Sequence, residues 1–190
     1  MDVPLCLLQG VVSSQSLDVG KIMQVFAASA SGWMTFGDQR CRCAIGQGGV
    51  KPAEDKVEGD GASPLGQWPI RRVLWRPDRG PQPLSAFPTM PIKENDGWCD
   101  APEDPSYNLP ITHPYPASAE HLWREDGLYD IIVILGHNDD PIVSGKGSAI
   151  FMHCASSDYR PTEGCVALSH DDLRLVLSLA RPGDAVAFTR

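Results

Sequence analysis

Ile131-Ile132-Val133-Ile134-Leu135 is an uninterrupted apolar run in which four of the five residues are β-branched. A strand with one face in water alternates apolar and polar side chains, whereas a continuous run is typical of a strand inside a sheet. The run therefore predicts a buried central strand.

Further strands are predicted on both sides of this run. Residues 33–36 and 41–45 flank Gly37-Asp38-Gln39, and aromatic runs around a Gly-Asp turn indicate a β-hairpin. The other strand candidates are residues 71–75, 147–153 and 185–188. Prolines recur over residues 77–116, so this segment is expected to wrap over a scaffold rather than form its own core. The charged residues 54–60 are expected to form a solvated loop.

Two short helices are predicted. Ser169 and Asp172 form a capping-box-like start for a helix over residues 171–180. Apolar residues follow at helical spacing: Leu173, Val176, Leu177 and Ala180. A second short helix is expected over residues 117–125, with Ser118 as its cap. The chain is thus predicted to be mainly β, with one or two short helices.

The chain has 190 residues and a formal net charge of −8. This length suits one domain over residues 21–190, preceded by an N-terminal extension of uncertain order over residues 1–20. An acidic chain lacks the basic patch that a nucleic-acid surface needs, and no apolar run is long enough for a transmembrane segment. Lys21 and the apolar residues after it imitate a secretory signal, but that stretch is short and contains Gln24, so no signal peptide is predicted.

The six cysteines are predicted to form neither a disulfide framework nor a metal site. Cys41 and Cys43 lie two residues apart on a predicted strand and share one face, but a zinc site needs two more ligands. Cys99 and the five histidines supply no paired Cys-x-x-Cys or His-x-x-x-His motif. Cys154 is expected in the core, because it points away from His153 on the same strand.

Cys165 differs from the other cysteines. It lies in the segment Pro161-Thr162-Glu163-Gly164-Cys165-Val166-Ala167-Leu168. A glycine directly before a cysteine frees the backbone to expose the sulfur and to aim N–H groups at an oxyanion. His153 ends an apolar strand twelve residues earlier. The pattern suits a nucleophilic thiol with its base. A histidine that only packs at the end of a strand is the alternative.

These residues carry a resemblance to a known family. The stretch Gly147-Ser148-Ala149-Ile150-Phe151-Met152-His153 and the segment from Thr162 to Leu168 resemble the YkuD-type L,D-transpeptidase catalytic domain, in the branch with FxH and PTxGCVAL motifs. Further segments from about residue 40 to the end are similar to that branch: residues 46–50, 58–64, 96–100, 122–126 and 136–138. The broader family usually has a second histidine where this chain has Glu163, which leaves His153 as the only motif histidine.

The resemblance implies a mixed β-sandwich fold and an acyl transfer without a cofactor or metal. Cys165 is expected to be the nucleophile, His153 the group that accepts and returns its proton, and backbone N–H groups around Gly164 and Cys165 the donors to the oxyanion. The substrate would be the tetrapeptide stem of peptidoglycan. Cys165 would form a thioester at the third residue, D-Ala would leave, and an amine would resolve the thioester as a 3→3 cross-link or another attachment.

Two alternatives stay open. With water as acceptor the same residues would act as an L,D-carboxypeptidase or amide hydrolase, and a degenerate domain would bind cell-wall peptides without catalysis. Thr162, His137 and Asn138 are candidate substrate contacts, although a plain turn at residues 137–141 explains His137 and Asn138 equally well. The family implies a periplasmic or cell-envelope location, while the weak signal leaves a cytoplasmic one open. A monomer is assumed.

Overall fold

The computed structural model describes residues 23–190, and the extension expected over residues 1–20 lies outside the described residues. Residues Ile131–Leu135 form strand β10, as predicted, and all five side chains are buried. The odd-numbered side chains of β10 face a larger core, and the even-numbered ones face a smaller core. The apolar run is continuous because both faces of this strand are covered.

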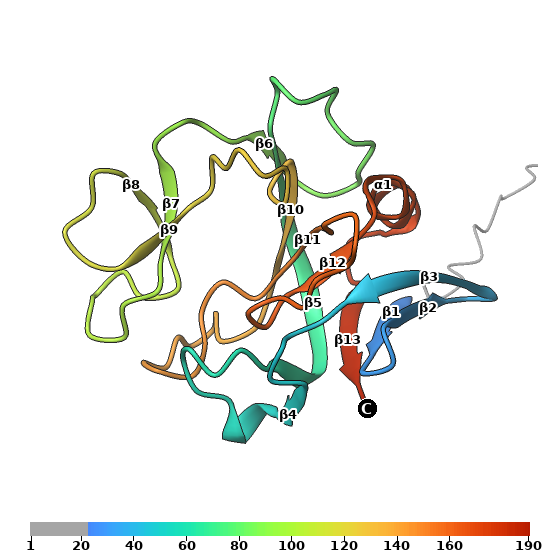
Figure 1. Ribbon diagram of the computed structural model, residues 1–190, viewed down its shortest axis with the longest axis horizontal. Helices are drawn as coiled ribbons and strands as arrows, with labels where there is room; N and C mark the ends of the chain where they lie inside the picture. The colour runs from blue at the N-terminus through green and yellow to red at the C-terminus, as the bar shows by residue number, and fades with distance from the viewer. Residues whose placement is uncertain (1–22) are drawn as a thin grey trace, which may run out of the picture.

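A sheet that closes on itself surrounds the larger core (Figure 1). Its ten strands within the described residues are β1 (Val25–Ser29), β2 (Trp33–Phe36), β3 (Gln39–Ala44), β4 (Val50–Pro52), β5 (Ser63–Trp75), β6 (Thr89–Pro91), β10, β11 (Phe151–Cys154), β12 (Val166–Leu168) and β13 (Ala185–Thr189). Their order is β10-β11-β12-β3-β2-β1-β13-β5-β4, with β6 beside β5. Closure depends on the long β5, whose residues 66–69 pair with β13 and whose residues 70–75 pair with β10.

The pairings are mixed, as predicted. β1 and β13 are parallel, as are β11 and β12, whereas β2 and β3 form the expected antiparallel hairpin. The mainly β prediction is therefore confirmed, and the layers of the sheet are joined edge to edge into a barrel-like enclosure.

A small antiparallel sheet lies beside the barrel and contributes Trp98 to the smaller core. Its central strand β7 (Asp96–Cys99) lies between β8 (Pro110–Thr112) and β9 (Ala119–His121), and Figure 1 shows all three to one side of the barrel. Trp98 and Leu122 from this region pack with Phe151 in the smaller core. The proline-rich segment thus wraps over the barrel, as predicted, and carries β6, β7 and β8.

The prediction of a helix over residues 117–125 is wrong. Strand β9 occupies the middle of that segment, and Glu120 pairs with Trp98 of β7. The backbone of the segment is held by a neighbouring strand, and local helix propensity carries no information about such a tertiary pairing.

Two other segments differ from their sequence interpretation. The strand expected over residues 147–153 begins only at Phe151, because Ala149 has a φ of 52° and donates its N–H to Asn108 Oδ1 rather than to a strand. Residues 25–29 of the stretch that imitates a secretory signal form β1, which pairs with β13 in the barrel.

The C-terminal helix is confirmed. Helix α1 (His170–Leu179) begins after Ser169, whose hydroxyl accepts a hydrogen bond from the Asp172 N–H at 3.1 Å. Three of the predicted apolar residues of α1 are buried in the larger core: Leu173, Val176 and Leu177. A short 3-10 helix, η1 (Ala53–Asp55), is the other helical element within the described residues. None of the helices described is long and apolar enough to span a bilayer.

The larger core predicts a strong response to cavity formation. Phe26 of β1 is fully buried, with its ring centroid 5.5 Å from that of Phe36. Phe26→Ala should lower the free energy of unfolding by about 3–5 kcal/mol, because it removes buried contacts and leaves a void. Denaturant unfolding measures this loss. Leu84→Ala is the control, since Leu84 is 77% exposed, and should change stability by less than about 0.5 kcal/mol. Equal losses would contradict the assigned core.

Candidate active site

The pairing of β11 with β12 brings Cys165 and His153 to one face of the sheet. The two strands are parallel, with Met152 beside Val166 and His153 beside Ala167. Because side chains alternate along a strand, Met152 and Val166 point into the larger core. His153 and Cys165 point to the opposite face, where both line a cavity.

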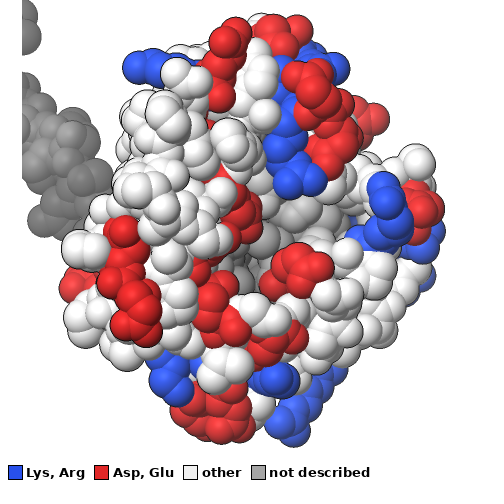
Figure 2. Space-filling view, turned by 60° about the vertical axis from the view of Figure 1, so that its left-hand side comes forward, with Lys and Arg blue, Asp and Glu red and all other residues white. Residues whose placement is uncertain are grey.

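The cavity has a volume of about 570 Å³ and lies between the outer face of the barrel and the loops around the small sheet. Figure 2 shows a hollow on this side of the molecule with acidic side chains gathered around it. Its lining carries five carboxylates but only two guanidinium groups: Glu58, Asp100, Glu120, Asp126 and Glu163, with Arg124 and Arg160. The cavity is therefore acidic.

The Cys165 thiol is held by the backbone of the segment before β11. Its Sγ donates to the carbonyl oxygen of Ala149 at 3.1 Å and accepts from the Phe151 N–H at 3.3 Å. Burial raises the pKa of Cys165 to about 12, and the charge of Glu120 adds to this. The sulfur is therefore a neutral thiol at neutral pH.

His153 is buried as a neutral base. Its Nδ1 lies 2.8 Å from the carbonyl oxygen of Cys154. A carbonyl only accepts, so Nδ1 carries the proton and Nε2 keeps its lone pair. Burial lowers the pKa of His153 to about 4. Among the described residues no hydrogen bond joins His153 to Cys165, and the register accounts for this, because the two lie about two residues apart along parallel strands.

The turn before Cys165 requires a glycine. Gly164 has a φ of 133°, and a Cβ at this position would lie 2.9 Å from the carbonyl oxygen of Ala62. The Ser63 hydroxyl donates to the Gly164 carbonyl at 2.8 Å. The Gly164 N–H donates to Thr162 Oγ1 at 3.2 Å. Within residues 23–190, the Cys165 N–H has no such acceptor.

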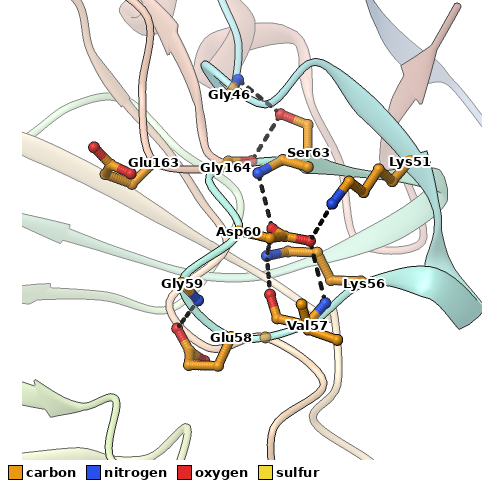
Figure 3. A network of polar contacts seen from close by, with 12 residues as sticks. Gly46, Lys51, Lys56, Val57, Glu58, Gly59, Asp60, Ser63, Glu163 and Gly164 are labelled. Atoms are coloured by element: carbon orange, nitrogen blue, oxygen red, sulfur yellow. Dashed lines mark hydrogen bonds and ion pairs between the residues drawn. The ribbon is translucent and has the colours of Figure 1, made fainter.

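A buried network of charged groups around Asp60 and Lys56 lies next to this turn (Figure 3). Asp60 accepts from the Lys56 ammonium at 2.6 Å and from the Ala62 N–H at 2.9 Å. Although burial opposes ionisation, these hydrogen bonds lower the pKa of Asp60 to about 2. Lys56 is 2% exposed, so the prediction of a solvated loop over residues 54–60 is wrong for this pair. The network fixes the backbone next to Ser63.

The other predicted contacts separate into two groups. Thr162 lines the cavity. His137 and Asn138 are not among its lining residues. The His137 Nε2 lies 3.0 Å from the Lys146 carbonyl oxygen, and the Asn138 amide donates to the Gly147 carbonyl at 2.9 Å. The structure thus places both in the turn that the sequence left open as an alternative.

The remaining cysteines of the described chain are packing residues. Cys41, Cys43 and Cys154 lie in the larger core, and Cys99 is buried elsewhere. Burial raises the pKa of Cys43 to about 12, which makes it an unreactive thiol. No cluster of three or more metal-ligating side chains occurs among residues 23–190.

Several cavity residues were not identified as site residues from the sequence, among them Glu58, Asp100, Glu120 and Ser148. Glu58, Asp100 and Ser148 lie inside segments that carried the family resemblance, so those motifs contained a signal. Glu120 had none, because its place beside the cavity follows from the pairing of β9 with β7.

The glycine turn predicts a difference between two matched substitutions. Gly164 and Gly183 both have a positive φ, but only Gly164 is in close contact, since a Cβ on Gly183 meets no atom within 4 Å. Gly183→Ala should cost about 1–2 kcal/mol of unfolding free energy from backbone strain. Gly164→Ala should cost at least about 1 kcal/mol more, because its methyl also displaces Ala62. Denaturant unfolding compares them, and equal losses would contradict the packing described.

Three comparisons place the chain among known proteins. The family model YkuD, the L,D-transpeptidase catalytic domain, matches residues 30–187. No curated protein matches. Three solved structures are similar. L,D-transpeptidase 1 of Mycobacterium tuberculosis is 13% identical with a TM-score of 0.40, over 88% of this chain and 62% of that one. An L,D-transpeptidase from Mycobacterium smegmatis is 13% identical with a TM-score of 0.37, over 88% and 58%. An L,D-transpeptidase in complex with imipenem is 15% identical with a TM-score of 0.38, over 87% and 58%.

The chain spans about three fifths of the length of these solved proteins. The family match, in contrast, extends over nearly all of the described barrel and includes both His153 and Cys165. The chain belongs to the YkuD family of L,D-transpeptidase catalytic domains.

Proposed function

We propose that the protein is a cysteine acyltransferase that acts on peptidoglycan stem tetrapeptides in the cell envelope. The observation that carries the proposal is the single cavity lined by both Cys165 and His153 in a chain of this family. No cofactor is needed, because covalent catalysis divides one acyl transfer into two easier steps.

In the first step, Cys165 Sγ attacks the carbonyl carbon between the third residue and D-Ala, and its proton passes to His153 Nε2. The tetrahedral intermediate collapses as the C–N bond breaks, and the proton moves from His153 to the departing amine of D-Ala. In the second step, an amine attacks the thioester, the C–S bond breaks and the thiol is restored. Water in place of the amine would make the same residues a carboxypeptidase.

The protonation states of Cys165 and His153 before substrate binds support proton transfer that is coupled to thiol attack. They do not support a preformed thiolate–imidazolium ion pair. The raised pKa of Cys165 and the lowered pKa of His153 leave both groups neutral at pH 7. The thiol must therefore leave the Ala149 carbonyl and lose its proton as the new bond forms. The Cys165 N–H is the better oxyanion donor, since the Gly164 N–H is already bonded to Thr162.

Intact-protein mass spectrometry tests the proposal. Incubation with a disaccharide-tetrapeptide should add the mass of the acyl group at Cys165 and release D-Ala. Cys165→Ala should remove the adduct, whereas the control Cys41→Ala should keep it, because Cys41 is a core residue on another strand. Mass on a different cysteine, or none on the wild type, would contradict the proposal. Products formed with and without an added amine identify the acceptor, and peptide binding without any turnover would favour a non-catalytic role.

The burial of His153 predicts an unusual pH profile. A base is active when unprotonated, so the rate of thioester formation should stay level from about pH 8 down to pH 5.5 and fall as the pH approaches the His153 pKa of about 4. His153→Gln should lower the rate by about 10²-fold or more, while the exposed control His170→Gln should not. An inflection near the ordinary imidazole pKa of 6.5 would argue against His153 as the buried base.

A further inference from the structure

Three carboxylates from separate segments of the chain line the cavity. Asp100 directly follows β7 and Glu120 lies on the adjacent strand β9, while Glu58 comes from the loop before β5. No lysine or arginine among residues 23–190 forms an ion pair with any of the three. Arg124 reaches the same cavity, but its guanidinium is bonded to Asp126.

The three carboxylates are close enough to repel one another. Burial raises the pKa of Glu120, the hydrogen bond from Tyr129 and the charge of Arg124 oppose this, and the charges of Asp100 and Glu58 add to the rise. Like charges gathered in a partly buried cavity are costly without a bound cation.

Two polar atoms of the same cavity are also without partners among the described residues. Ser148 is 8% exposed and its Oγ makes no hydrogen bond. The Asp100 Oδ1 is buried and equally unsatisfied. Buried polar groups are normally bonded, so these two atoms are placed for a group that arrives with the substrate.

The geometry points to a subsite in which Glu58, Asp100, Glu120 and Ser148 bind a primary ammonium group of the substrate. An ammonium has three N–H donors on one atom and suits acceptors that are spread around it. A metal ion is disfavoured, because these side chains do not converge into a ligand cluster. The subsite lies beside the nucleophile, since Glu120 acts electrostatically on the Cys165 thiol. The inference rests on the proposed function, which supplies two such groups: a side-chain amine of the donor peptide and the acceptor amine.

Calorimetry on Cys165→Ala tests the donor without any need for catalysis. The probes are a stem tetrapeptide with lysine at its third position and the same peptide with that side-chain amine acetylated. The free amine should bind about tenfold more tightly, because a charge-assisted hydrogen bond is lost on acetylation. Adding Glu120→Gln or Asp100→Asn should remove most of this preference and leave the acetylated peptide unaffected. The exposed controls Glu94→Gln and Asp38→Asn should preserve it.

A second experiment tests whether the subsite binds the acceptor amine. Mass spectrometry measures the rate at which butylamine resolves the thioester of the wild-type protein. If the subsite serves the acceptor, Glu120→Gln and Asp100→Asn should slow this resolution about tenfold relative to hydrolysis. Insensitivity of both donor binding and amine resolution to these two substitutions would overturn the inference. An ammonium preference in binding without any thioester at Cys165 would sustain the subsite and overturn the proposed acyl transfer. A thioester that forms equally from both peptides, with a rate of amine resolution unchanged in the variants, would support the proposed acyl transfer and overturn the subsite.

Discussion

Strand β10 has apolar side chains on both faces, and water must be excluded from each of them. The inner face is covered by the barrel, which β5 closes by pairing with β13 along its first half and with β10 along its second. The outer face packs in the smaller core, to which the proline-rich segment and the residues after it contribute Ile92, Trp98 and Leu122. The cavity lies between the outer face of the barrel and the loops around the small sheet.

Hydrogen bonds, and not packing alone, position the turn that carries Cys165. The Gly164 turn has its backbone groups bonded to Thr162 and Ser63, and the latter is anchored by the network around Asp60 and Lys56. Such a network is favourable only when every member is bonded, because an unpaired buried charge costs several kcal/mol. This explains why Lys56 and Asp60 of a charged segment lie under the site instead of in solvent.

The electrostatics of the cavity suit a substrate that brings its own positive charge. Cys165 and His153 rest as neutral groups, so the site stores no ion pair of its own. The carboxylates around the cavity favour a bound cation. The charges of Glu120 and Glu163 disfavour an anionic thiolate at Cys165.

The sequence by itself determined the elements whose signal is local. The apolar run of β10, the hairpin of β2 and β3, the cap and apolar spacing of α1, and the Gly-Cys turn each followed from periodicity, capping or backbone freedom. The alternation of side chains along β11 also placed Cys154 and His153 on opposite faces of the strand. Only the tertiary structure decided that residues 119–121 pair as β9, that β11 begins only after Ala149, and that the Asp60 side chain is buried. It also decided that His137 and Asn138 lie in a turn and that Glu120 lines the same cavity as Cys165. These outcomes depend on partners far away in the chain, and burial and pairing between distant residues leave no local pattern to read.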